Sequence, residues 1–383
     1  MTPRERILAA IRRVEPDRVP IDFGGTGVTT LVARAHENLR AHLGLPDAPP
    51  PAPMARRFST VIPDESIMRL FGADARSVTT GASDAQPEQA LSENMIIDEW
   101  GVTWVRPEGG QFMMLDGPLH KIEEPDVSHL RRIAWPDPAD PGRFRGLRER
   151  ARKLHEETDY AVILYAGTGP IHLGQAVRGF AQWMEDTVLR PTFVEALLDI
   201  TTEVWIEQAR RALTEAGEYV DVVLYGDDIG SQRGPLFSPS LYRRIFKSRQ
   251  RAMIDTVKRW GKPFLYHTCG SVYDFIPDLI DIGVDALNPV QVAAGKMDTL
   301  RLKREFGRDL CFWGGVDTQQ VLPRGTENDV REEVRRRIDH MAAGGGYVLA
   351  SVHNIQEDVP PANIVAMYEE GLRYGSGRLS ATG

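Results

Sequence analysis

The chain has little of what a secreted, membrane-spanning or nucleic-acid-binding protein needs. Only two of its 383 residues are cysteine, Cys269 and Cys311, which is too few for a disulfide framework and favours a reducing, cytoplasmic location. No run of about 20 apolar residues occurs, so we expect no membrane partner, and we expect no signal peptide. The net charge of −8 comes without a basic patch, which argues against nucleic acid as a partner.

The part of the chain from about residue 160 onward shows a regular pattern. Short apolar runs, each fit for a buried strand, alternate with longer amphipathic segments, and this order is typical of parallel βαβ units. The expected strands are 160–165, 220–225, 263–266, 286–288, 310–313 and 347–350, with an early one at 19–23. The expected helices are 2–13, 174–188, 191–216, 239–260, 272–282, 297–306 and 328–343.

The pattern predicts an α/β fold, best matched by a TIM-type (β/α)8 barrel whose missing strand lies in the irregular N-terminal third. A doubly wound open sheet is the alternative, but Gly24-Gly-Thr-Gly27 has the wrong spacing for a dinucleotide-binding turn. We expect one barrel domain over residues 1–383, with residues 24–120 as an N-terminal insertion or lid that contains a hairpin at 98–105 and 112–115.

Polar residues stand where the expected strands end, which is where a barrel carries its chemistry. The pair His267 and Cys269 is the most informative, because residues two apart on a strand face the same side and zinc prefers imidazole and thiolate ligands. Catalytic zinc usually takes three protein ligands, so a third is needed. Cys311 lies early in its strand and is better explained as a small buried residue. His353 directly follows a strand and is the better candidate.

A resemblance appears at these residues. Tyr266-His-Thr-Cys-Gly270 and the segment 275–289 resemble the uroporphyrinogen decarboxylase superfamily, and more closely its zinc-dependent, corrinoid-linked methyltransferase branch. The segments 226–232, 314–319, 344–349 and 353–364 match as well. In methylcobamide:coenzyme M methyltransferases a cysteine stands where this chain has His353. The resemblance therefore implies a TIM-type barrel with zinc held by His267, Cys269 and His353.

The resemblance also implies a function. We expect a zinc-dependent methyltransferase or demethylase that moves a methyl group between a small molecule and a corrinoid (a cobalamin). The small molecule would be a methyl ether, a methanol-like donor or a thiol acceptor. The chain lacks a corrinoid-binding signature of its own, so the corrinoid would arrive on a partner protein. A homodimer is left open as the assembly.

Other residues at strand ends receive roles as expectations. Asp228 and Asp317 are candidate catalytic residues, and the candidate substrate contacts are Asp22, Gln232, Asn288 and Tyr266. For His172, a role at a helix start and a contact with ligand are equally open.

Two other functions compete with the methyltransferase. One is a corrinoid-independent decarboxylase or lyase on the same barrel. The decarboxylase hypothesis is weakened because residues 20–27 contain no arginine. These residues match the arginine-rich segment with which the decarboxylase binds the carboxylates of its substrate. The other is a non-catalytic barrel that binds a small molecule.

Overall fold

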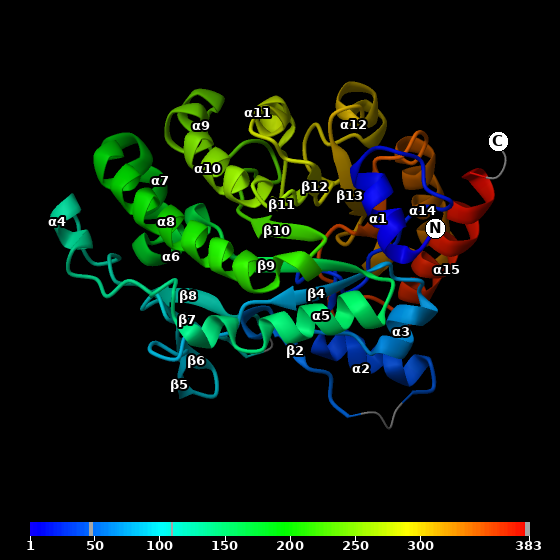
Figure 1. The fold of residues 1–383 in the computed structure, drawn as a ribbon, viewed down its shortest axis with the longest axis horizontal. Coiled ribbons are helices and arrows are strands. Elements are labelled where there is room, and N and C mark those ends of the chain that lie inside the picture. The colour runs from blue at the N-terminus through cyan, green and yellow to red at the C-terminus, as the bar shows by residue number, and fades with distance from the viewer. Residues whose placement is uncertain (46–48, 109, 380–383) are drawn as a thin grey trace.

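The centre of the molecule is one curled sheet of seven parallel strands (Figure 1). The computed structural model describes residues 1–45, 49–108 and 110–379. In spatial order the strands are β14 (Tyr347–Ser351), β13 (Cys311–Val316), β12 (Ala286–Asn288), β11 (Phe264–His267), β10 (Val222–Gly226), β9 (Ala161–Thr168) and β4 (Ala75–Thr79). The strand hidden in the N-terminal third is therefore β4.

The gap between the two edge strands β14 and β4 is closed by residues 20–22. The N–H of Asp22 donates to the carbonyl of Leu349, and the N–H of Leu349 donates to the carbonyl of Pro20, both at 2.9 Å. On the other side, the N–H of Asp74 donates to the carbonyl of Ile21 at 2.8 Å. The strand expected at 19–23 is thus reduced to a single bridge at Ile21, and the expected TIM-type barrel is confirmed.

Helices connect successive strands and cover the outside of the barrel (Figure 1). They are α5 (Leu147–Glu157), α6 (Pro170–Arg178), α7 (Phe180–Leu189), α8 (Pro191–Ala216), α9 (Pro239–Ile245), α10 (Lys247–Lys258), α11 (Ile276–Asp281), α12 (Thr299–Phe306), α13 (Val321–Arg324), α14 (Glu327–Met341) and α15 (Pro361–Leu379), with the 3-10 turns η2 (Pro141–Phe144), η3 (Gly217–Tyr219) and η4 (Tyr273–Phe275). The single helix expected over 174–188 is wrong. Gly179 has φ +90°, a conformation that breaks a helix and suits glycine, so α6 and α7 are separate.

Side chains that alternate along the strands fill the barrel interior. They form one buried cluster of small and branched residues, among them Ile163, Leu224, Leu265 and Cys311. Helix α1 (Pro3–Ile11), capped at its start by Thr2, adds Ile7, Ala10 and Ile11 to this cluster. The expectation that Cys311 is a small buried residue is confirmed.

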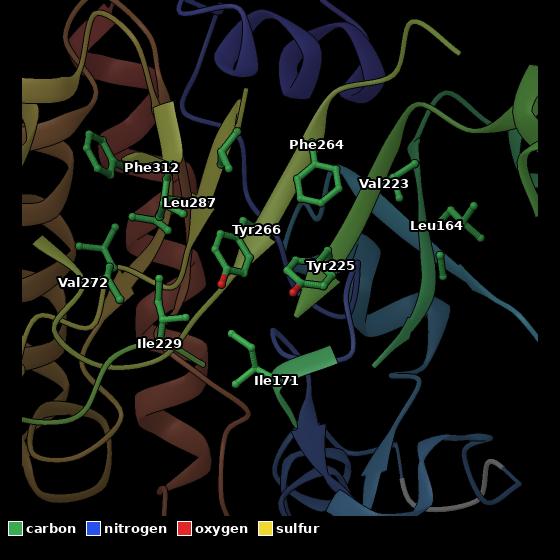
Figure 2. Close-up of a cluster of buried hydrophobic side chains, with 14 of the residues drawn as sticks. Leu164, Ile171, Val223, Tyr225, Ile229, Phe264, Tyr266, Val272, Leu287 and Phe312 are labelled. Atoms are coloured by element: carbon green, nitrogen blue, oxygen red, sulfur yellow. The ribbon is translucent and has the colours of Figure 1, made fainter. Parts of the chain in front are cut away.

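The opposite faces of the same strands pack against the helices. Figure 2 shows this layer, in which Tyr225, Phe264 and Tyr266 lie side by side on neighbouring strands β10 and β11. The ring centroids of Tyr225 and Tyr266 are 5.0 Å apart. Strand residues therefore divide by parity into those facing the barrel axis and those facing the helices.

Residues 24–120 add two small antiparallel sheets to the barrel and also supply β4. The first sheet contains β1 (Leu31–Val32), β3 (Thr60–Val61) and β2 (Pro53–Ala55); the second contains β5 (Gln89–Ser92), β6 (Met95–Ile97), β7 (Thr103–Val105) and β8 (Met113–Asp116). The helices near them are α2 (Ala33–His42), η1 (Arg56–Phe58), α3 (Glu65–Leu70) and, further along the chain, α4 (Val127–Leu130). Within the described residues, no helix has the length and apolar character needed to cross a bilayer.

Candidate metal centre and its cavity

The three residues expected to bind zinc come together at the carboxyl ends of β11 and β14. One ligand atom from each of His267, Cys269 and His353 lies within 4.8 Å of the others. His267 is the last residue of β11 and shares the parity of Leu265, which points it to the barrel axis. His353 follows β14 by two residues. The rings of the two histidines meet edge to face, with centroids 5.4 Å apart.

A tight turn places Cys269 beside His267. Gly270, the next residue, has φ +86°, and a Cβ there would lie 2.6 Å from backbone atoms of Gly230 and Ser231. Only glycine permits this close approach. The thiol sulfur of Cys269 then lies 3.5 Å from Nε2 of His267.

The chemistry and spacing of these donors fit zinc. Two imidazoles and one thiol are borderline-soft ligands of the kind zinc takes, and three protein ligands leave one position open, as in catalytic zinc sites. Zn–N and Zn–S bonds at tetrahedral angles would separate the two donor atoms by about 3.5 Å, which is the Cys269–His267 spacing observed.

Hydrogen bonds from neighbouring strands orient two of the three candidate ligands. Nδ1 of His267 lies 2.6 Å from Oδ1 of the buried Asn288 on β12, so Nε2 is the ring nitrogen left for a metal. The backbone N–H of Cys269 donates to Oδ1 of Asp228 at 2.6 Å. Both contacts hold the ligands in place from outside the cluster.

Burial keeps the candidate ligands uncharged. Removal from water lowers the pKa of His353 to about 4 and also lowers the pKa of His267. The same burial, with the charge of Asp228 nearby, raises the pKa of the Cys269 thiol well above its ordinary value. Neutral imidazole is the form that binds a metal, whereas the thiol has to lose its proton when a metal binds.

The cluster opens into a cavity of about 400 Å³ with mostly apolar walls. The barrel contributes Tyr165, Thr168, Leu224, Gly226 and the metal cluster itself. Residues from the N-terminal extension and from α6 and α7 complete the lining: Gly27, Val28, Met54, Ala55, Arg57, Phe58, Thr79, Asp98, Trp100, Trp104, Met114, His172, Leu173, Gln175, Ala176 and Phe180, with Asp228 and Asn354. Such a cavity has the size of a small-molecule site.

Of the two neighbouring aspartates, Asp228 lines the cavity and Asp227 does not. Asp227 is fully buried and accepts hydrogen bonds from the N–H groups of Ile171 and His172 and from the hydroxyl of Tyr225. Burial is the largest influence on it and raises its pKa to about 6. The carboxyl of Asp228 is partly buried, but its contact with the His172 ring outweighs this burial and lowers its pKa.

The other residues expected at the site lie outside the cavity lining. Tyr266 has the outward parity of its strand, so its hydroxyl donates to the carbonyl of Asp227 in the helix-facing layer (Figure 2). Asp22 is fully buried and accepts hydrogen bonds from Thr29 and from the indole N–H of Trp313. Burial raises its pKa to about 6.

Gln232 and Asp317 are placed in loops at the rim. The amide of exposed Gln232 bonds the carbonyl of Ala293, and Oδ1 of Asp317 accepts the N–H of Gln319. Neither side chain lines the cavity. Their expected roles stay predictions.

His172, by contrast, is part of the cavity wall. It lies in the first turn of α6, and the sequence leaves its role open between a helix start and a ligand contact. The Gly169-Pro170 helix start after a strand was the only local signal, and it does not show which way the ring points.

The fold belongs to a known class. A family model for uroporphyrinogen decarboxylase (URO-D) matches residues 109–374, so the chain belongs to that family. A solved structure described as a methyltransferase from Methanosarcina mazei is 21% identical, with a TM-score of 0.66, over 98% of this chain and 99% of that chain. This structural similarity supports the TIM-type fold of the chain.

A second solved structure, a complex of a GH113 β-1,4-mannanase, is 12% identical over 92% of this chain and 98% of that chain. Its TM-score is 0.35, too low to support an argument. No curated protein sequence is significantly similar to this chain.

Proposed function

We propose that this protein is a zinc-dependent methyltransferase that moves a methyl group between a small molecule and a corrinoid carried by a partner protein. The observation that carries the proposal is the cluster of His267, Cys269 and His353 in the lining of a mostly apolar cavity. The Methanosarcina mazei methyltransferase has the same fold and is consistent with it.

The protein's own residues have separable tasks in this proposal. His267, Cys269 and His353 would hold the zinc, with Asn288 orienting the ring of His267. Bound zinc would supply Lewis acidity toward the oxygen or sulfur atom of the small molecule. Asp228 fixes the backbone at Cys269, and the apolar walls exclude water from the reacting atoms.

The ligand set favours an oxygen-linked methyl donor over a thiol acceptor. One thiolate and two neutral imidazoles leave a net positive charge on a bound Zn²⁺, whereas a second thiolate would cancel it. A zinc ion that keeps a net positive charge withdraws electron density from a donor oxygen more strongly than a neutralised zinc ion does. We therefore favour demethylation of a methyl ether or methanol-like donor.

The decarboxylase alternative is disfavoured by the charges around the cavity. Decarboxylation of a substrate with several carboxylates requires several cationic partners, but Arg57 is the only arginine or lysine among the described lining residues. Its guanidinium is already paired with Asp98 at 3.1 Å and lies over the ring of Trp104. Among the described lining residues, no unpaired arginine or lysine is therefore present to bind a polycarboxylate.

An anaerobic assay with chemically reduced cobalamin and a panel of methyl ethers, methanol and methyl thioethers tests this function. Methyl-cobalt forms with a characteristic visible spectrum, and we expect it with the zinc-loaded wild type and not with Cys269→Ser. Release of carbon dioxide from a polycarboxylate, unaffected by Cys269→Ser, would instead establish the decarboxylase.

A further inference from the structure

The ring of His172 faces the cavity beside the metal cluster. The side chain is 34% exposed, and the residue lines the cavity that also contains His267, Cys269 and His353. Its backbone is fixed because its N–H and that of Ile171 both donate to the buried carboxylate of Asp227. The ring is therefore held in place by the barrel and accessible to a molecule in the cavity.

Two carboxylates keep this ring in its charged form. Nε2 of His172 lies 3.4 Å from Asp228, and Nδ1 lies 3.6 Å from Asp227. Burial opposes the charge, but the hydrogen bond and charge of Asp228, with the charge of Asp227, outweigh it and raise the pKa of His172 to about 9. The other titratable or charged groups around the cavity are His267, Cys269, His353, Tyr165, Arg57 and Asp98.

None of those other groups is suited to donate a proton to a bound molecule. His267, Cys269 and His353 are engaged as candidate metal ligands, and a guanidinium such as Arg57 does not release its proton. Asp98 accepts hydrogen bonds from Arg57 and from the indole of Trp104. Burial raises the pKa of the Tyr165 hydroxyl, so it holds its proton more tightly than an ordinary phenol.

The cavity walls suit an aromatic donor. Trp100, Trp104, Phe58 and Phe180 line it together with Met54 and Met114, and aromatic side chains pack favourably against other rings. A cavity of about 400 Å³ lies within the range for ring-sized ligands and far exceeds the needs of methanol.

We propose that the methyl donor is an aromatic methyl ether and that His172 is the catalytic acid that protonates its departing oxygen. This proposal rests on the proposed function. The methyl–oxygen bond breaks with its electron pair staying on oxygen, while the electron pair of a reduced Co(I) corrinoid forms the new cobalt–carbon bond. The oxygen takes the proton of the His172 imidazolium, so the products are a phenol, a methyl-Co(III) corrinoid and a neutral His172.

The test varies how much the departing oxygen needs a proton. Anisole leaves as a weakly acidic phenol and needs an acid, whereas 4-nitroanisole leaves as a stabilised phenolate and does not. For His172→Gln we expect a loss of about 10²- to 10⁴-fold in the anisole rate, the usual contribution of a general acid, and a loss of less than about tenfold for 4-nitroanisole. A purely structural role would lower both rates equally.

Two measurements keep the result independent of turnover. Zinc content of His172→Gln and its calorimetric affinity for anisole should match the wild type, because His172 is not a candidate metal ligand and its polar ring is a small part of a mostly apolar cavity wall. In wild-type protein carrying ¹⁵N-labelled histidine, the His172 ring should give imidazolium signals at pH 7. His155→Gln, a change on α5 outside the cavity, should leave every reading unaltered.

Different results would overturn the acid role of His172 and the methyltransferase activity itself. Equal losses on both ethers, or a neutral His172 ring at pH 7, would overturn the role of His172 while leaving the methyltransferase intact. Absence of methyl transfer by wild type from every donor would overturn both.

Discussion

Replacing Asn288 by leucine should weaken zinc binding without touching a ligand. Asn288 is fully buried, and its Oδ1 lies 2.6 Å from Nδ1 of His267. Leucine has a similar volume but no acceptor, so the ring loses the contact that directs Nε2 toward Cys269, and a buried N–H is left unpaired. An unpaired buried group costs about 1–3 kcal/mol.

That cost is close to the measured effect of removing comparable outer partners of metal-binding histidines, about 10- to 100-fold in affinity. We therefore expect Asn288→Leu to raise the zinc dissociation constant by about 10- to 100-fold, which corresponds to about 1.4–2.7 kcal/mol. Competition for zinc against a chromophoric chelator, at fixed pH, measures this directly.

Two variants separate the hydrogen bond from general damage. Asn288→Asp keeps an acceptor oxygen and should bind zinc more tightly than Asn288→Leu. Asn363→Leu removes another buried amide, one that donates to the carbonyls of Leu322 and Gly325 at α13, and should leave zinc affinity unchanged. A dissociation constant for Asn288→Leu within twofold of wild type would refute the reasoning.

Three further predictions rest on other contacts in the structure. Asp74→Ala should reduce the free energy of unfolding by about 3–5 kcal/mol in urea titrations, because it removes the carboxylate paired with Arg18 and one of the two carboxylates paired with Arg6, which keeps only Asp17; a loss under about 1 kcal/mol would contradict it. Gly169→Ala should lower stability by about 1–3 kcal/mol and reduce methyl transfer, since its Cβ would lie 2.4 Å from Cγ of Asp227; unchanged melting and activity would exclude this. The anisole rate should be flat below pH 9 and fall about tenfold per pH unit above it, because the protonated His172 is the active form and its pKa is raised to about 9; a rate that rises through this range would contradict the sign.

The regular part of the fold was predictable because local pattern and final structure agree there. The apolar run 286–288 and the amphipathic segment 191–216 predict β12 and α8 with the bounds they have. The N-terminal third resisted prediction for a physical reason. β4 carries Arg76, which pairs with Glu65 in the structure, and a buried arginine hides the strand from any pattern of apolar residues.

The candidate ligands were predictable, but the cavity around them was not. Strand parity predicts the meeting of His267 and Cys269, although β11 ends at His267 and a turn brings Cys269 beside it. The same parity could have excluded Tyr266 from the cavity. The placement of His172 depends on how the start of α6 packs against Asp227 at the end of β10. Those two segments are 55 residues apart, and no local pattern in the sequence joins them.

The central claim is that His267, Cys269 and His353 bind one zinc ion. Zinc per chain, measured after anaerobic purification, tests it for wild type and for the variants His267→Ala, Cys269→Ser, His353→Ala and Cys311→Ser. We predict about one zinc in wild type and in Cys311→Ser, whose thiol is buried in the barrel interior, and loss of zinc in the other three. A wild type that takes up no zinc on supplementation, or a full zinc content in Cys269→Ser, would contradict the account.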